Sequence, residues 1–98
     1  MNLISQINNI LKRFETGDKL KSYRDLQKIF KRNKDNSLLR YNLAVIQQEL
    51  NLNQEAKINY IHLIKTENSL KAMINLYNIY ISEANYYEAL NTIESILK

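Results

Sequence analysis

The sequence predicts an all-α protein, and three observations lead to that prediction. Apolar residues recur with helical spacing in six segments of roughly 12 to 15 residues, the usual length of helices in small domains. Short polar breaks separate these segments at regular intervals. The 98 residues include one Gly, no Pro and no Cys, which argues against glycine-rich phosphate loops, disulfide frameworks and most β-rich folds with tight turns. The length corresponds to one domain, residues 1–98.

The helices are expected, in chain order, at about residues 2–15, 19–33, 37–50, 54–66, 69–82 and 86–97. Side chains that commonly cap helix N-termini stand at the start of five of them: Asp18, Asn36, Asn53, Ser69 and Asn85. Glu88 follows Asn85 by three residues and resembles the second half of a capping box. Because the breaks are short, consecutive helices are expected to be antiparallel neighbours.

The helices form pairs that repeat along the chain. A small residue recurs in the second helix of each pair, at Ser22, Ala56 and Ala89, and the two spacings differ by a single position. Apolar residues recur in the same register, as Leu26, Tyr60 and Ile93 in the second helices and as Ile10, Leu43 and Leu76 in the first. The connection in the first pair is one residue shorter. These spacings predict three repeats, at about residues 3–36, 37–69 and 70–98.

Over nearly its whole length the chain resembles the tetratricopeptide repeat family, most clearly from Arg40 to Asn68. The resemblance implies a right-handed α-solenoid of three antiparallel helix pairs, in which stacked neighbours supply the core that one repeat cannot bury alone. It also implies protein–protein interaction or scaffolding, without a cofactor. Three positions depart from the family pattern: Arg40 replaces a large apolar residue, Gln47 replaces an aromatic, and Tyr77 replaces a small residue. Tyr77 predicts looser packing or a shifted crossing in the last pair.

The resemblance also implies a concave groove, lined by the first helix of each repeat, that binds an extended peptide or a partner segment. The groove candidates are Asn8, Lys12, Tyr41, Asn42, Val45, Glu49, Lys71, Asn75 and Asn78. Asn side chains can grip a peptide backbone, and Lys12 and Lys71 could attract a carboxylate. Family members that clamp a C-terminal carboxylate match this chain only at Asn42 and Lys71, so a generic peptide groove is the preferred interpretation.

The last helix is apolar on more than one face, and a polar capping helix would normally cover the end of such an array. The residues expected to mediate self-association here are Tyr86, Tyr87, Ile93 and Ile96. Two interpretations are open: the chain is an N-terminal accessory piece of a longer protein, for example a transferase, or this end pairs with a second copy.

Charge is concentrated in the first part of the chain. Residues 1–40 carry a net charge of +6 and residues 41–98 carry −2, within an overall +4. Lys21, Arg24, Lys28 and Arg32 follow helical spacing and form a basic stripe on the second helix. The stripe is interpreted first as a solvated face. The alternative is an adaptor for nucleic acid or an anionic membrane, although no groove-reading motif accompanies it.

The sequence offers little for catalysis. His62 is the single histidine, and its helical neighbours Ile58 and Thr66 provide neither a nucleophile nor a metal ligand set. The carboxylates are scattered singly, so no general acid–base pair is evident. We therefore expect a protein that is not an enzyme, has no metal site or cofactor, and binds protein or peptide. With no apolar run long enough to span a membrane and no signal peptide, a cytoplasmic location is expected.

Overall fold

The computed structural model describes residues 2–98, so Met1 of the expected domain lies outside the described residues. Within that range the chain forms six helices and no strand, which confirms the all-α fold class. The helices are α1 (Leu3–Thr16), α2 (Lys19–Arg32), α3 (Ser37–Glu49), α4 (Asn53–Glu67), α5 (Leu70–Ser82) and α6 (Tyr86–Leu97). Each bound lies within one residue of the expected range.

Four of the five expected caps are confirmed. The side chains of Asp18, Asn36, Ser69 and Asn85 each accept a hydrogen bond from the backbone N–H three residues later. The prediction for Asn53 is wrong, because Asn53 is already helical and Leu52, which makes no side-chain capping bond, precedes it. Only one of the two hydrogen bonds of the expected capping box is present, from the Glu88 N–H to the Asn85 side chain. The Asn85 N–H donates to the Tyr80 carbonyl and not to the Glu88 side chain.

The turns within the second and third pairs share one conformation. Asn51 and Ala84 hold equivalent places in the two pairs, and both adopt positive φ, at 62° and 57°. In each turn the next residue donates its backbone N–H to a carbonyl five residues earlier: Leu52 to Gln47 and Asn85 to Tyr80, both at 2.8 Å. This bond draws Leu52 into the cap position and explains the error at Asn53. The shorter first connection uses Gly17 at φ −147° instead.

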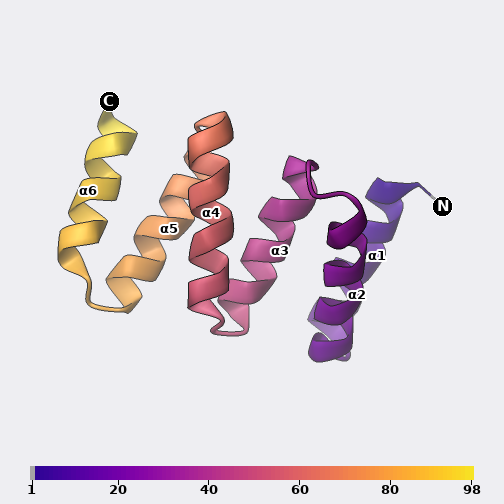
Figure 1. Ribbon diagram of the computed structural model, residues 1–98. Helices are drawn as coiled ribbons and strands as arrows, with labels where there is room; N and C mark the ends of the chain where they lie inside the picture. The colour runs from indigo at the N-terminus through magenta and orange to yellow at the C-terminus, as the bar shows by residue number, and fades with distance from the viewer. Residues whose placement is uncertain (1) are drawn as a thin grey trace.

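The helices stand side by side in chain order, and the two termini lie at opposite ends of the array (Figure 1). The Cα trace measures 41 × 24 × 17 Å along its principal axes. The main backbone contacts join each helix to the next one in the sequence. The molecule therefore has two end faces, one formed by α1 and α2 and the other by α5 and α6.

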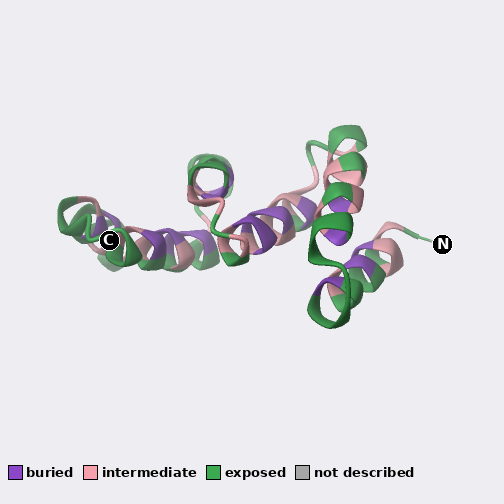
Figure 2. Cartoon of the chain, turned by 90° about the horizontal axis from the view of Figure 1, so that it is seen from below, coloured by how far each residue is buried: buried purple, intermediate pink, exposed green. Residues whose placement is uncertain are grey.

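Two apolar clusters form the core, and they use the same register. The first joins α1 and α2 to Leu39, Leu43 and Ile46 of α3. The second joins α3 and α4 to α5 through the equivalent residues of the next pair: Ala72, Leu76 and Ile79. In Figure 2 the buried residues gather on the sides by which neighbouring helices face each other. Each cluster thus packs the first helix of one pair against the pair before it.

The last pair is not loosely packed as Tyr77 had suggested, because α5 and α6 are in as close backbone contact as α3 and α4. Tyr77 shares a helical face with Ile74 and Ile81, which are both exposed. Its half-buried ring therefore lies towards the outer face of α5 and does not separate α5 from α6.

Candidate interaction surfaces

The candidate groove residues divide into two groups. Asn8, Lys12, Glu49, Lys71 and Asn78 are exposed. The remaining four are half-buried: Tyr41, Asn42, Val45 and Asn75. Only the exposed group presents its full side chain to a ligand, so the set does not act as one uniform lining.

Two of the half-buried groove candidates are committed to an internal hydrogen-bond network. The Nδ2 of Asn75 donates to the hydroxyl of Tyr41 at 2.9 Å and to that of Tyr60 at 3.2 Å. The Tyr60 hydroxyl donates in turn to Oε1 of Gln48 at 2.8 Å. The Tyr41 and Tyr60 rings meet edge to face, 6.1 Å apart. This network ties α5 to α3 and α4, and it occupies the amide nitrogen with which Asn75 was expected to grip a peptide.

Asn42 is similarly engaged. Its Nδ2 donates to the Leu38 carbonyl in its own helix, at 2.9 Å. The amide nitrogens of Asn42 and Asn75 are therefore both used internally. Of the asparagines expected to line the groove, Asn8 and Asn78 are the exposed ones.

A second polar network lies between α2, α3 and α4. Asn59 donates from Nδ2 to Oε1 of Gln47 at 2.8 Å and accepts from Nη1 of Arg40 at 2.9 Å. Gln47 continues the chain by donating from Nε2 to the Tyr23 hydroxyl at 3.1 Å. The Arg40 guanidinium also stands over the Phe30 ring, 4.8 Å from its centroid. Arg40 and Gln47 are thus joined to each other through Asn59.

Sequence reasoning did not identify this second network. The available signal was that two polar residues, Arg40 and Gln47, lie two helical turns apart on one helix. Buried polar groups need partners, so Arg40 and Gln47 required a third polar residue on the facing helix. Asn59 fills that place, and it is buried.

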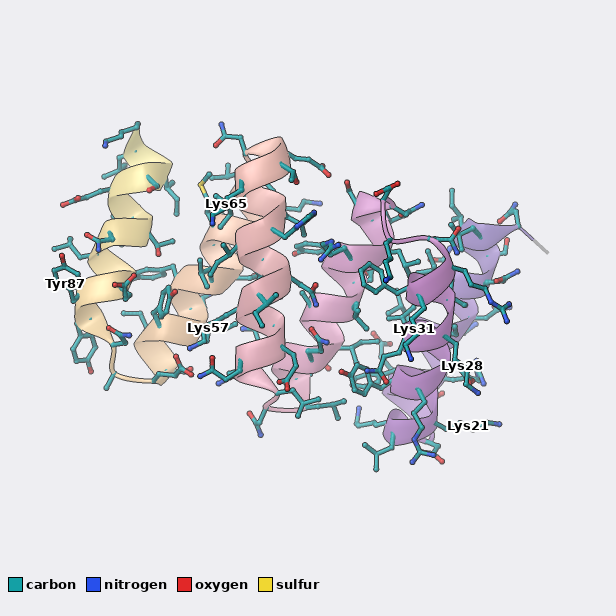
Figure 3. All side chains as sticks on the ribbon, viewed as in Figure 1. Lys21, Lys28, Lys31, Lys57, Lys65 and Tyr87 are labelled. Carbon is teal, nitrogen blue, oxygen red and sulfur yellow. The ribbon has the colours of Figure 1, made fainter. Side chains whose placement is uncertain are left out.

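The basic stripe of α2 is exposed at all four positions: Lys21, Arg24, Lys28 and Arg32. Lys21, Lys28 and Lys31 follow one another along the outer side of α2 in Figure 3. The two ion pairs of the described residues lie elsewhere, joining Arg13 to Asp25 at 3.3 Å and Lys57 to Glu83 at 2.8 Å. The stripe is therefore a solvent-facing positive surface.

Clefts open at several places along the array. One of about 730 Å³ lies between α1 and α2 and is lined by residues that include Gln6, Ile10 and Arg13. Another, about 350 Å³, runs between α2 and α4 over Leu43 of α3. Two smaller ones lie between the α2–α3 connection and α4, about 280 Å³, and between α4 and α6 over Leu76 of α5, about 240 Å³. Lys12, which borders the first cleft, is the groove candidate found among their linings.

Large apolar side chains are exposed on the α5–α6 end face. On α6, Tyr86 is 65% exposed, Tyr87 74%, Leu90 56% and Leu97 80%. Tyr87 projects from α6 at the end of the array, away from the other helices (Figure 3). The other two residues expected to mediate self-association, Ile93 and Ile96, are half-buried.

The α5 helix adds a second exposed apolar row to this face. Leu70, Ile74 and Ile81 are exposed, and Tyr77 lies between them on the same side of the helix. We call Leu70, Ile74, Tyr77, Ile81, Tyr86, Tyr87, Leu90, Ile93 and Leu97 the terminal apolar face. Sequence reasoning had placed only Tyr86, Tyr87 and Ile93 of this set among its candidates.

The terminal apolar face corresponds to a surface that is covered inside the molecule. Ile74 and Ile93 occupy, in the last pair, the positions that Tyr41 and Tyr60 occupy in the pair before it. Tyr60 is fully buried because α5 packs over it. The terminal pair therefore presents, at its outer side, the positions that α3 and α4 use to bind the next helix.

The described residues hold no group of three or more His, Asp and Glu side chains that could bind a metal ion. His62 lies on the exposed side of α4. None of the described helices is both long and apolar enough to cross a membrane. Searches for related proteins gave no match among family models, curated proteins or solved structures.

Proposed function

We propose that the protein is a tetratricopeptide-type array of three antiparallel helix pairs in a right-handed solenoid, and that it serves as a protein-interaction module. Two observations support the repeat architecture. The turns at Asn51 and Ala84 have the same conformation and the same backbone bonds. In the two core clusters, α3 and α5 pack against the preceding pair through residues at equivalent positions of the two helices.

The observation that carries the function is the concentration of apolar surface at one end. Seven of the eleven large apolar side chains that are exposed among the described residues lie on α5 and α6. Exposed apolar patches of this kind mark interaction sites in proteins that otherwise bury such groups. We therefore place the docking site on the terminal apolar face.

The occupant of this face is a helix. Inside the molecule, the corresponding surface of α3 and α4 is covered by α5, which contributes Ala72, Leu76 and Ile79. A partner helix with a small residue, a Leu and an Ile at the same spacing would bury Ile74 and Ile93 in the same way. Ridge-into-groove packing of this type needs apolar contact without a specific sequence elsewhere on the helix.

The test uses a labelled peptide of residues 69–82, which carries that spacing, in fluorescence anisotropy titrations. We expect saturable one-to-one binding, since Ile74 and Ile93 hold on this face the places of Tyr41 and Tyr60, which contact α5. Leu90→Glu should weaken binding roughly tenfold or more, because it places a charge in the apolar contact. The matched control is Ile58→Glu on α4, at a position that is also more than half exposed, and it should bind normally. Equal binding by wild type and Leu90→Glu would refute the site.

The concave groove is a second proposal, supported by the exposed Lys12 and Lys71. Acidic peptides are the ligands that these two side chains would attract. The variant that combines Lys12→Glu with Lys71→Glu should lose capture of an acidic peptide. Unchanged capture would remove the groove from consideration.

The basic stripe supports a third proposal, an adaptor for polyanions, because its cations are exposed and outside the ion pairs. Binding of this kind depends steeply on salt. Random-sequence duplex DNA and anionic vesicles, tested at 50 and 150 mM salt, separate the two polyanion classes. Absence of binding to both at low salt would leave the stripe as a solvated helix face.

A further inference from the structure

We propose that the partner of the terminal apolar face is a second copy of the chain, joined tail to tail about a two-fold axis. This inference rests on the proposed function, because it assumes that the face docks a helix. It adds the identity of that helix: α6 of another molecule, packed antiparallel to α6, with the two α5 helices flanking the contact.

The spacing along α6 suits such a pairing. Tyr86, Leu90, Ile93 and Leu97 follow one another at intervals of four, three and four residues, the spacing of a coiled-coil seam. This row is symmetric about the point between Asn91 and Thr92. An antiparallel copy therefore places Tyr86 opposite Leu97 of the second molecule and Leu90 opposite Ile93. Every apolar residue of the row meets an apolar residue.

The same symmetry holds on α5. Leu70, Ile74, Tyr77 and Ile81 have the same four, three, four spacing. A two-fold axis through the α6 pair brings the α5 row of each molecule to the edge of the contact. The result is a four-helix arrangement in which each copy covers the other's exposed apolar side chains.

The available area is sufficient for a stable dimer. With about 200 Å² for each large side chain, the exposed fractions of the seven α5 and α6 residues amount to about 800 Å². Standard interfaces bury about 800 Å² on each partner. The largest apolar patch on a typical monomer is smaller, about 300–600 Å². Two copies of this face thus match the size of a specific interface.

The α1–α2 end of a second molecule is not a suitable partner for the terminal apolar face. Gln6, Ile10 and Arg13 on α1 are the first-pair equivalents of Leu39, Leu43 and Ile46, which pack against the pair before them. Two of these three positions are therefore polar at the α1–α2 end. Covering the terminal apolar face with this end would bury Arg13, whose ion pair with Asp25 is partly exposed, at a cost in desolvation. Head-to-tail stacking is disfavoured for this reason.

Sedimentation equilibrium from 10 µM to 1 mM tests the association. We expect the wild type to dimerise and Leu90→Glu to raise the dimer dissociation constant roughly tenfold or more. Ile58→Glu, the matched control, should dimerise like the wild type, and circular dichroism should show that both variants are folded. A wild type that stays monomeric at 1 mM, or a Leu90→Glu variant that dimerises normally, would overturn the inference.

A disulfide experiment tests the antiparallel arrangement of the two α6 helices. Because the chain has no native Cys, only the introduced thiols can form disulfides. Equal amounts of Tyr86→Cys and Leu97→Cys protein are mixed in a glutathione redox buffer. In this buffer, disulfides accumulate only between thiols that the dimer holds close together. Random pairing of equal amounts gives the mixed disulfide in the same quantity as the two homodimers together. Antiparallel pairing predicts that the mixed disulfide clearly exceeds the sum of the two homodimers. A mixed disulfide that only equals that sum or falls below it, or no disulfide, would contradict it. If the peptide of residues 69–82 binds while the wild type remains monomeric, the proposed function stands and the second copy fails as its partner.

Discussion

Asn59 joins α4 to α3 in a chain of hydrogen bonds that Gln47 continues to Tyr23 of α2. It is buried, and both its side-chain atoms are used, towards Gln47 and Arg40. Removing one partner from a buried pair leaves the other without a bond, which costs more than the bond contributes when both are present. Asn59 therefore contributes to stability through the contact between α3 and α4.

We predict that Asn59→Ala lowers the free energy of unfolding by about 1–3 kcal/mol, measured by urea denaturation. Asn78→Ala, at an exposed position, should change it by less than about 0.5 kcal/mol. Replacing both Gln47 and Asn59 with Leu should recover part of the loss, since no buried amide is then left without a partner. Equal effects of Asn59→Ala and Asn78→Ala would show that the network contributes nothing.

Tyr60 couples stability to alkaline pH. Burial raises the pKa of its hydroxyl above the ordinary value of 10.0, so the folded state holds the proton longer than the unfolded state does. Its contribution to stability is complete below pH 10 and is lost as the pH rises further, because the unfolded state gains from ionisation.

We predict that the free energy of unfolding of the wild type falls more between pH 9 and pH 11 than that of Tyr60→Phe, by about 1.4 kcal/mol. Urea denaturation at the two pH values measures the difference. Tyr87→Phe, whose ring is exposed, is the control and should show the wild-type decrease. A Tyr60→Phe decrease equal to that of the wild type would contradict the assigned role of burial.

At the scale of the elements, the turns are the features that repeat most closely. Asn51 and Ala84 hold the same positive-φ position in two successive pairs. Asn tolerates this left-handed region better than Ala, whose Cβ approaches the following carbonyl. The third pair thus carries a small backbone strain that the second pair avoids.

We predict that Ala84→Asn raises the free energy of unfolding by about 0.5–1 kcal/mol, and that Asn51→Ala lowers it by a similar amount. Thermal unfolding followed by circular dichroism measures both. A destabilising Ala84→Asn would mean that the turn is held by contacts other than its backbone conformation.

The helices could be predicted from the sequence because apolar spacing and capping residues are local signals. Asn53 was assigned wrongly as a cap because the backbone bond from Leu52 to Gln47, which sets the start of α4, cannot be read from a cap preference. The polar networks were missed because their partners lie far apart in the chain. Gln47 and Tyr23 are separated by 24 residues, and Asn75 and Tyr41 by 34. The engagement of the Asn75 amide nitrogen by Tyr41 and Tyr60 was missed for the same reason.

At the scale of the whole molecule, the linear arrangement leaves two unequal end faces. The α1–α2 end is polar at Gln6 and Arg13, where the inner helices α3 and α5 are apolar. The α5–α6 end retains exposed apolar rows, and Ile74 and Leu97 among them hold the places of Tyr41 and Ile64, which pack in the second core cluster. This asymmetry is why association is assigned to one end.

The most direct test of that assignment is a dilution series followed by two-dimensional ¹H–¹⁵N NMR of the wild type, from 20 µM to 1 mM. We predict that amide signals near Leu90 and Ile93 shift or broaden with concentration, while those near Gln6 on α1 and Lys28 on α2 stay constant. Changes centred on α1 or α2, or a spectrum that does not depend on concentration, would contradict the assignment.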